Sequence, residues 1–244
     1  MRVLVLSDIH SNLEALHAVV GHATKEGGFD GVWVTGDLVG YGPDPGPVLD
    51  ALRVLGATCV GGNHDLAACG RIGVDAFNPV AAEAALWTAG ALNERDRDGL
   101  RELPLTCIEE GVTLVHGSLR EPEWEYLLDH EPAEAQFSLQ TTPVSIVGHS
   151  HLQFVCIERD GDRPRFHYTS DGDDLLLDDH RVILNAGSVG QPRDGDPRAG
   201  YMLLDTTARV VGWRRVPYDI DKVRAKIDAA GLPRVLGARL YEGR

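Results

Sequence analysis

The sequence predicts an α/β fold with two β-sheets, and three observations support this prediction. Short β-branched runs alternate with helical stretches in the N-terminal quarter, and segment 77–103 has apolar residues at helical spacing. From residue 105 onward the pattern consists mostly of strands joined by turns that contain Gly or Asp. With 244 residues, of which 43% are apolar and 25% charged, the chain has ordinary globular composition. We expect residues 1–244 to form a single domain, with 77–103 as a helical insertion.

The N-terminal segments follow a β-α-β-α-β order. We expect strands at 3–6, 32–35 and 58–61 and helices at 13–26 and 47–55. This alternation is typical of a parallel sheet, whose ligands gather at the carboxyl ends of the strands. The loops that leave these ends are therefore the first places to look for a functional site.

The remaining chain predicts a second, more antiparallel sheet. The Asn78-Pro79 pair is a helix start signal, and the helical pattern ends before Pro104. An amphipathic helix is expected from Asp219 to about Ala230, followed by a short polar tail. The expected strands of this part are 105–109, 112–116, 144–148, 154–159, 165–169, 182–185, 200–204 and 209–216.

Composition excludes several classes of protein. Lys and Arg number 23 against 37 Asp and Glu, a net charge of −14, so general attraction to nucleic acid or to an anionic membrane is not expected. The stretch 135–157 lacks charged side chains but contains Gln, Pro and His, so no membrane span is predicted. The N-terminus lacks the pattern of a signal peptide, and we expect a cytoplasmic protein. The four cysteines are widely spaced, which indicates buried small apolar residues rather than disulfides or a zinc knuckle.

Five short motifs at predicted strand ends carry chemistry. In an extended segment residues i and i+2 point the same way, so Asp8 and His10 would face one point in space. Carboxylate, amide and imidazole groups without thiolate suit Mn, Fe, Zn or Ni ions, and a carboxylate that can bridge suggests two ions. The other four motifs are Gly36-Asp37, Gly62-Asn63-His64-Asp65, His116-Gly117 and Gly148-His149-Ser150-His151.

In this order, D-x-H, G-D, G-N-H-D, H-G and G-H-S-H resemble the calcineurin-like metallophosphoesterase superfamily. The later segments 185–188 (N-A-G-S) and 190–198 (G-Q-P-R-D-G-D-P-R) are similar to a small bacterial phosphodiesterase-type branch, so the resemblance covers nearly the whole chain. It implies the calcineurin-like metallophosphoesterase fold, an αββα sandwich of two mixed β-sheets flanked by helices.

The resemblance also implies a dinuclear metal site and a role for each residue. Two divalent metal ions, Mn²⁺ in the first place with Fe, Zn or Ni as alternatives, would hold a bridging hydroxide as nucleophile. His64 would contact the phosphate and protonate the leaving group, with either Asp65 or Asp44 orienting it. One ion would be held by Asp8, His10, Asp37 and His151, and the second by Asp37, Asn63, His116 and His149, with Asp37 as the bridge.

Departures from the family pattern narrow the range of expected substrates. The protein-phosphatase branch and its relatives that cleave diadenosine tetraphosphate carry the pattern G-D-x-x-D-R-G, whereas segment 36–42 reads G-D-L-V-G-Y-G and lacks both the second acid and the Arg. Without that Arg a singly charged phosphodiester is favoured over a dianionic monoester or a long polyphosphate. Arg193 or Arg198 would compensate as substrate-binding residues, unless both are solvated loop charges. Trp87, Trp124 and Tyr126 are expected to be either packing residues or part of a wall, formed by segments 77–103 and 120–130, that stacks on a nucleobase or an aryl leaving group.

The sequence thus predicts a metal-dependent phosphoesterase, with a phosphodiesterase preferred. A phosphomonoesterase or phosphoprotein phosphatase is the alternative, and a non-catalytic protein-binding scaffold is a further one. The expected partner is a small phosphoester, nucleotides included. The sequence does not indicate an oligomeric state.

Overall fold

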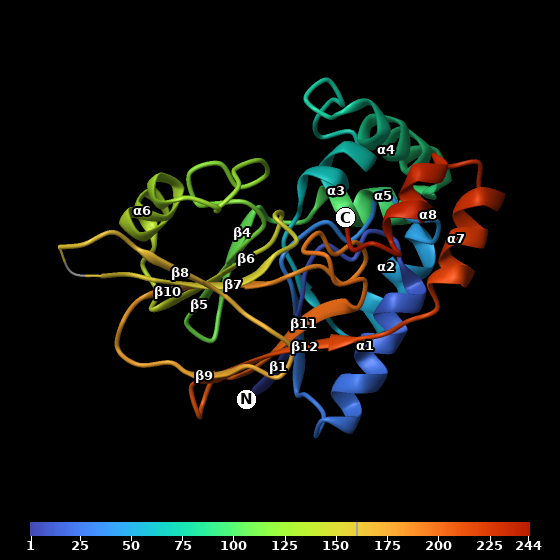
Figure 1. Ribbon diagram of the computed structural model, residues 1–244. Helices are drawn as coiled ribbons and strands as arrows, with labels where there is room; N and C mark the ends of the chain where they lie inside the picture. The colour runs from blue at the N-terminus through green and yellow to red at the C-terminus, as the bar shows by residue number, and fades with distance from the viewer. Residues whose placement is uncertain (160) are drawn as a thin grey trace.

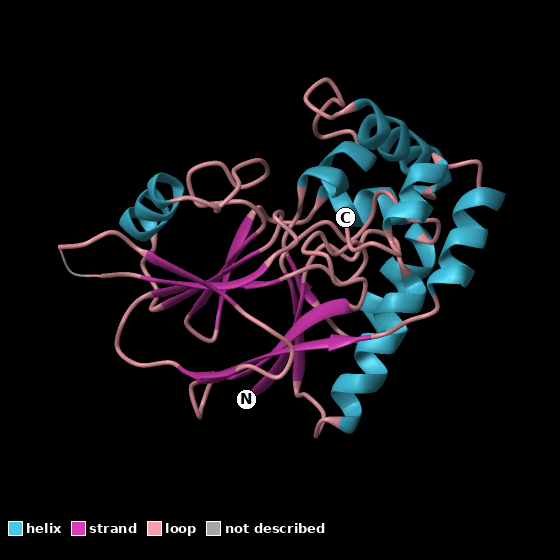
Figure 2. Ribbon diagram, viewed as in Figure 1, coloured by secondary structure: helices cyan, strands magenta, loops and turns pink. Residues whose placement is uncertain are grey.

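The computed structural model describes residues 1–159 and 161–244, in which two mixed sheets lie between layers of helices (Figure 1). Helices α1 and α2 cover one sheet, and α6 lies on the outer side of the other (Figure 2). The predicted αββα sandwich is therefore confirmed.

The first sheet combines a parallel and an antiparallel half. Its order is β3-β2-β1-β11-β12-β9, in which β1, β2 and β3 are parallel and the other neighbours are antiparallel. Strands β11 and β12, expected in the second sheet, thus complete the first one. The bounds are β1 Arg2–Leu6, β2 Gly31–Val34, β3 Thr58–Cys59, β9 Asp174–Leu176, β11 Ala199–Asp205 and β12 Val210–Val216.

The second sheet has the order β4-β5-β6-β10-β7-β8. Strands β5, β6 and β10 are parallel, and the outer pairs are antiparallel. Its parallel centre places the ends of β5 and β6 beside each other. The bounds are β4 Thr106–Glu109, β5 Val112–Val115, β6 Val144–Val147, β7 Gln153–Ile157, β8 Arg165–Tyr168 and β10 Val182–Ala186.

The alternation of apolar side chains along each strand builds the layers. Leu4 and Leu6 of β1 pack with the helices, whereas Val3 and Val5 face the second sheet, where they share a core with Ile146. Side chains of a strand alternate between the two faces of the sheet, so β1 contributes to two cores. The sheets are thereby joined through a continuous apolar layer.

The helices depart from the predictions at four places. Segment 77–103 forms two helices, because Leu92 leaves the helical conformation and Asn93 caps the second. The expected polar tail contains helix α8, whose Leu236 is buried. Helices α3 and α6 were not predicted. The bounds are α1 Leu13–Lys25, α2 Pro45–Val54, α3 Asn63–Ala68, α4 Pro79–Ala91, α5 Glu94–Arg101, α6 His130–Leu139, α7 Ile220–Ala229 and α8 Arg234–Arg239.

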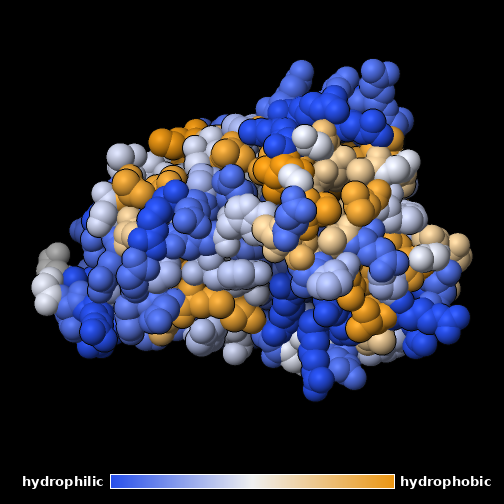
Figure 3. Space-filling model, turned by 90° about the horizontal axis from the view of Figure 1, so that it is seen from above, coloured by the Kyte–Doolittle hydropathy of each residue, from blue (hydrophilic) through white to orange (hydrophobic). Residues whose placement is uncertain are grey.

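The described residues have a surface of mixed polarity (Figure 3) and include four cysteines. Among the described residues no helix is both long and apolar enough to cross a membrane. Hydrophilic and hydrophobic residues are interspersed over the face seen from above (Figure 3). All four cysteines are free; Cys69 and Cys156 are buried, and Cys59 and Cys107 are half-buried.

Candidate metal centre

The loops at the carboxyl ends of β1, β2, β3, β5 and β6 bring all seven predicted ligand residues together. Each of the seven is buried, and His149, the most accessible, is 5% exposed. Because β1 and β2 belong to one sheet and β5 and β6 to the other, the cluster lies between the two sheets. The residues are Asp8 and His10 after β1, Asp37 after β2, Asn63 after β3, His116 after β5, and His149 and His151 after β6.

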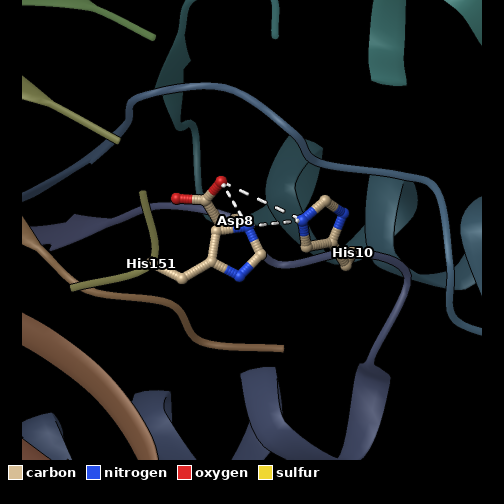
Figure 4. Close-up of side chains that lie close together, drawn as sticks. All are labelled: Asp8, His10 and His151. Carbon is tan, nitrogen blue, oxygen red and sulfur yellow. Dashed lines mark hydrogen bonds and ion pairs between the residues drawn. The ribbon is translucent and has the colours of Figure 1, made fainter. Parts of the chain in front are cut away.

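Asp8, His10 and His151 form a first group (Figure 4). The Oδ1 atom of Asp8 lies 3.2 Å from Nε2 of His151, which in turn lies 3.2 Å from Nε2 of His10. Asp8 and His10 converge as predicted, but not because they lie in a strand. Strand β1 ends at Leu6, and both residues have left-handed backbone conformations, with φ of 50° and 48°.

Asp37, His116 and His149 form a second group, which Asn63 joins. Nε2 of His116 lies 3.4 Å from Asp37 Oδ2, 3.1 Å from His149 Nδ1 and 3.2 Å from Asn63 Oδ1. The same Oδ2 atom of Asp37 is 3.7 Å from Nε2 of His10 in the first group. Asp37 therefore stands between the two groups, where a bridging carboxylate would have to be.

The histidine tautomers show that these groups fit cations. One ring nitrogen of each histidine faces a backbone carbonyl oxygen: Thr35 for His116 Nδ1 at 2.8 Å and Trp124 for His149 Nε2 at 3.1 Å. A carbonyl only accepts, so in the neutral ring that nitrogen carries the hydrogen and the other one carries a lone pair. The remaining two carbonyls are those of Val39 for His10 and Gln191 for His151.

The lone pairs of the neutral rings consequently face one another. Nε2 of His10 meets Nε2 of His151, and Nε2 of His116 meets Nδ1 of His149, at contact distances that only a shared cation or proton can make favourable. The Oδ1 atom of Asp8 is also buried without a hydrogen-bond partner among the described residues. Hydrogen bonds from a ligand histidine to a backbone carbonyl are typical of metal sites, because they fix the tautomer. The residues present therefore fit divalent metal ions.

The electrostatics of the cluster also favour bound cations. Burial alone would raise the pKa of Asp37, but the His116 and His64 rings hold it well below its usual range. Burial lowers the pKa of His149 to about 3, so this ring is neutral and can act as a ligand. Burial also opposes protonation of His116, but the Asp37 carboxylate outweighs it and raises that pKa to about 9. The cluster thus attracts positive charge next to Asp37.

Backbone geometry around the cluster is unusual. In the described chain nine non-glycine residues have positive φ, a conformation that side chains disfavour and that is concentrated at functional sites. Two glycines allow close approach: a Cβ on Gly36 would lie 2.6 Å from His116 Nδ1, and one on Gly62 would lie 2.2 Å from Asp37 Oδ1. Seven of the nine non-glycine residues with positive φ lie at the site, namely Asp8, His10, Ser11, Asp37, Tyr41, His149 and His151.

His64 lies beside the metal-binding residues at the start of α3. Its backbone N–H donates to Asp37 Oδ1 at 2.9 Å, and its ring packs at 4.3 Å from that of Tyr41 and at 5.0 Å from that of Phe77, measured between centroids. Burial lowers the pKa of His64 to about 4. The ring is therefore neutral at pH 7, and its Nδ1 is buried without a partner among the described residues.

Neither carboxylate expected to orient His64 does so. The Asp65 carboxylate accepts backbone N–H groups of Leu38, Val39 and Gly62 at 3.0 to 3.2 Å. Asp44 instead pairs with Lys226 at 2.8 Å. Packing against Tyr41 and Phe77, rather than a carboxylate, positions the ring, so both expectations are corrected.

A cavity of about 370 Å³ opens onto the cluster. Trp124 and Tyr126, left open between packing and wall, both line it; the Trp124 ring contacts Phe77, and the Tyr126 ring stacks on His149 at 4.0 Å. The cavity walls come from the segment before α4, the loop after β5 and the C-terminal end. The lining residues are Asp37, Tyr41, Asn63, His64, Ala76, Phe77, Asn78, Ala81, Trp124, Tyr126, His149, His151, Arg193, Arg239 and Arg244.

The structure brings one of the two predicted arginines to this cavity. Arg193 lines it, whereas Arg198 lies outside and forms ion pairs with Asp196 and Asp171, each at 2.7 Å. Phe77 lies in segment 77–103, one of the two expected walls, whereas Trp87 does not line the cavity and donates to Ala230 O at 3.1 Å. Tyr41, Arg239 and Arg244 were not predicted. The G-D-L-V-G-Y-G departure was the one signal that could have indicated Tyr41, and nothing in the local sequence marks Arg239.

Comparisons with known proteins identify the family of the chain. Residues 1–209 match the calcineurin-like phosphoesterase superfamily domain. The chain is 38% identical to the uncharacterized protein MJ0912 of Methanocaldococcus jannaschii over 99% of this chain and 98% of that protein. It is also 32% identical to a symmetrical bis(5′-nucleosyl)-tetraphosphatase of Pectobacterium atrosepticum, over 51% of this chain and 46% of that enzyme.

Solved structures show the same relationship over the whole chain. A metallophosphoesterase from Sphaerobacter thermophilus is 42% identical, with a TM-score of 0.90 and coverage of 100% of this chain and 99% of that one. The protein PH1004 from Pyrococcus horikoshii shares the fold, with a TM-score of 0.80 at 20% identity over 100% of this chain and 98% of that one. The chain belongs to the calcineurin-like phosphoesterase superfamily.

Proposed function

We propose that this protein is a metal-dependent phosphodiesterase. The observation that carries the proposal is the pair of buried His and Asp groups joined by the Asp37 carboxylate, at the floor of an open cavity. Divalent ions at this site would supply Lewis-acid activation of a phosphoryl group and a nucleophile drawn from water. We propose Mn²⁺ as the ion, and Fe, Zn and Ni suit the same ligands.

In this proposal the position of each side chain determines its role. One ion would be held by Asp8, His10 and His151 together with Asp37, and the other by Asp37, His116 and His149 together with Asn63. The backbone carbonyls behind the four histidines hold each ring in the ligand tautomer. No side chain of the cluster needs to form a covalent bond to phosphorus.

We propose His64 as the general acid for the leaving oxygen. Its ring lines the cavity, lies with His10 and Asp37 in a third group that could hold a cation, and is neutral before substrate binds. An anionic phosphoryl group beside the ring would raise the pKa of His64, because nearby negative charge favours the imidazolium form. Proton donation would thereby be coupled to substrate binding.

The cavity supports a diester with an aromatic substituent, such as a nucleotide ester. Phe77, Trp124 and Tyr126 give the cavity aromatic walls, and Arg193, Arg239 and Arg244 line the same cavity. Aromatic faces stack on nucleobases and aryl groups. The similarity to a symmetrical bis(5′-nucleosyl)-tetraphosphatase over half of the chain supports a nucleotide-like substrate.

The direct test combines metal analysis with two aryl esters. The purified protein is expected to hold two equivalents of transition metal and to hydrolyse bis(p-nitrophenyl) phosphate faster than p-nitrophenyl phosphate, with loss of activity on chelation. Faster hydrolysis of the monoester would replace the diesterase proposal with a phosphomonoesterase. Metal-free protein that stays inert with added Mn²⁺ would contradict catalysis and favour a binding role.

A further inference from the structure

Two arginines stand side by side on the wall of the cavity. Arg193 comes from the loop between β10 and β11, and Arg239 from the last residue of α8. Both side chains donate to Oε1 of Gln191, Arg193 through Nη2 at 3.0 Å and Arg239 through Nη1 at 3.5 Å. The Arg193 guanidinium also lies 5.8 Å from the centre of the Tyr41 ring. The pair is therefore held in place at the edge of the candidate metal centre.

Neither guanidinium is neutralised within the described part of the chain. Neither Arg193 nor Arg239 forms an ion pair there, and the Nε atom of Arg239 is buried without a partner. The neighbouring arginines behave differently, since Arg198 pairs with Asp196 and Arg215 pairs with Asp194. In a chain with 37 acidic and 23 basic residues, two adjacent unpaired cations at one cavity need an explanation.

Within the described part of the chain, no acidic side chain neutralises the charges of these two guanidiniums. Burial lowers the pKa of Arg239, and the Arg193 charge lowers it further, so the two side chains repel each other in the free protein. The C-terminal segment nevertheless keeps Arg239 in position: Leu236 and Leu240 are buried, and Gly195 N–H donates to Gly243 O at 3.0 Å. An anion between the two guanidiniums would remove this repulsion.

We infer that Arg193 and Arg239 form a second anion site, which binds a further phosphate group of the substrate beside the scissile one. The inference rests on the proposed function. A diester phosphate carries one negative charge, which the ions at the candidate metal centre neutralise, so two additional guanidiniums match a second, dianionic group. The preferred substrate class is therefore a nucleotide-like diester with a second phosphate that reaches Arg193 and Arg239.

A matched pair of substrates tests this inference in the Mn²⁺-loaded protein. Thymidine 5′-(p-nitrophenyl phosphate) and its 3′-phosphorylated counterpart have the same scissile bond and leaving group and differ by one phosphate. We expect kcat/KM to be at least about tenfold higher for the phosphorylated ester, the factor that one charge-assisted hydrogen-bonded contact provides. Calorimetry should show the same preference for thymidine 3′,5′-bisphosphate over the 5′-monophosphate.

Three variants locate the effect. Arg239→Gln and Arg193→Gln should each reduce the ratio of kcat/KM between the two esters toward one. Arg234→Gln is the matched control, because Arg234 lies on the same helix, is 93% exposed and does not line the cavity; its ratio should equal that of the wild type. Thermal unfolding of each variant verifies that it is folded. Because either arginine substitution alone should reduce the ratio, the second variant is an independent test of the first.

The outcomes separate the inference from the proposed function. Turnover of both esters at equal kcat/KM, together with equal binding of the two nucleotides, would overturn the second anion site and leave the phosphodiesterase proposal standing. A preference that persists in both arginine variants would also overturn it. Absence of turnover with either ester and with bis(p-nitrophenyl) phosphate would overturn the proposed function, and the inference with it.

Discussion

The Asp37 carboxylate contacts histidines of both ligand groups, through one oxygen that lies between His10 and His116. Its other oxygen accepts the backbone N–H of His64, so the side chain has a fixed orientation. Loss of this one negative charge should therefore affect both metal ions and not one alone.

We expect Asp37→Asn to weaken the binding of both ions by more than about 100-fold, because even residues that only support metal ligands contribute 10- to 100-fold. Metal content after dialysis and hydrolysis of bis(p-nitrophenyl) phosphate measure the effect. Asp50→Asn, at a position that is 64% exposed, is the control and should keep both ions. Unchanged turnover at matched metal occupancy would contradict the bridging role.

His64→Ala should retain both ions and lower kcat by about 10²- to 10⁴-fold, the usual contribution of a general acid. The loss should grow as the leaving group becomes more basic, which kcat values for aryl esters of graded leaving-group pKa will show. The exposed His167 provides the control substitution, His167→Ala. An equal loss for every ester would leave His64 a role in phosphate binding only.

At the scale of elements, the turn after β2 depends on the absence of a side chain at Gly36. Its φ is +88°, and a Cβ there would also lie 2.9 Å from Gly62 N. We expect Gly36→Ala to lower the free energy of unfolding by about 1 to 3 kcal/mol and to displace His116 from the cluster. Chemical denaturation and metal content measure the two effects.

Gly21→Ala gives a matched comparison in α1. A Cβ at Gly21 meets no other atom within 4 Å, and Ala is favoured over Gly in a helix by about 1 kcal/mol. The same substitution should therefore stabilise the protein there. If both variants were equally stable, the close approach at Gly36 would not matter.

Lys226 joins three helical segments. Its Nζ contacts Glu14 of α1 at 2.7 Å and Asp44, the residue before α2, at 2.8 Å. Burial would raise the pKa of Glu14, but Lys226 and Lys222 outweigh this effect and lower it from 4.5. The stabilisation is therefore complete above pH 4.5 and is lost as the pH falls through the lower pKa of the folded state.

We expect Lys226→Met to lower the free energy of unfolding at pH 7 by about 1 to 3 kcal/mol, because two partly buried carboxylates lose a partner. Below pH 4.5 the difference from the wild type should shrink, since Glu14 protonates in both proteins. Urea denaturation at several pH values measures this, with the exposed Lys25→Met as control. A difference that does not change with pH would show that Glu14 is not the responsible group.

The elements that the sequence predicted are those with strong periodicity and clear caps. Asn12 and Asn78 accept from backbone N–H groups at the starts of α1 and α4, and both helices lie where expected. Helices α3 and α8 have six residues each, too few to show a helical period. Strand β9 has three residues and exists through pairing with β12, which is not a local property.

The candidate site likewise contains residues that the sequence predicted and residues that it did not. The convergence of the candidate ligand residues was predictable because each follows an apolar strand in a short motif, and strand ends meet at one edge. The sequence offered Trp124 as a possible wall residue, but its place beside Phe77 and Arg239 was not predictable, because these residues come from three distant segments that meet only in the folded chain. Arg198 illustrates the limit, since its partner Asp171 lies 27 residues away.

At the scale of the whole molecule, the two sheets share one apolar layer. Trp33 of the first sheet and Leu114 of the second belong to the same buried core. We expect residues 1–244 to unfold in a single cooperative transition, which differential scanning calorimetry tests. Added Mn²⁺ should raise the midpoint of that transition, because it binds the folded state. Two separate transitions would indicate two domains.

The origin of the cavity walls has a consequence for how such a protein can change over evolutionary time. The metal-binding residues lie at strand ends that the sheets fix, whereas the walls are surface segments before α4, after β5 and around α8. Insertions and deletions are tolerated in such connecting segments and not in packed strands. Proteins that descend from this chain could therefore acquire a different substrate through changes in these three surface segments, while the proposed reaction stays the same.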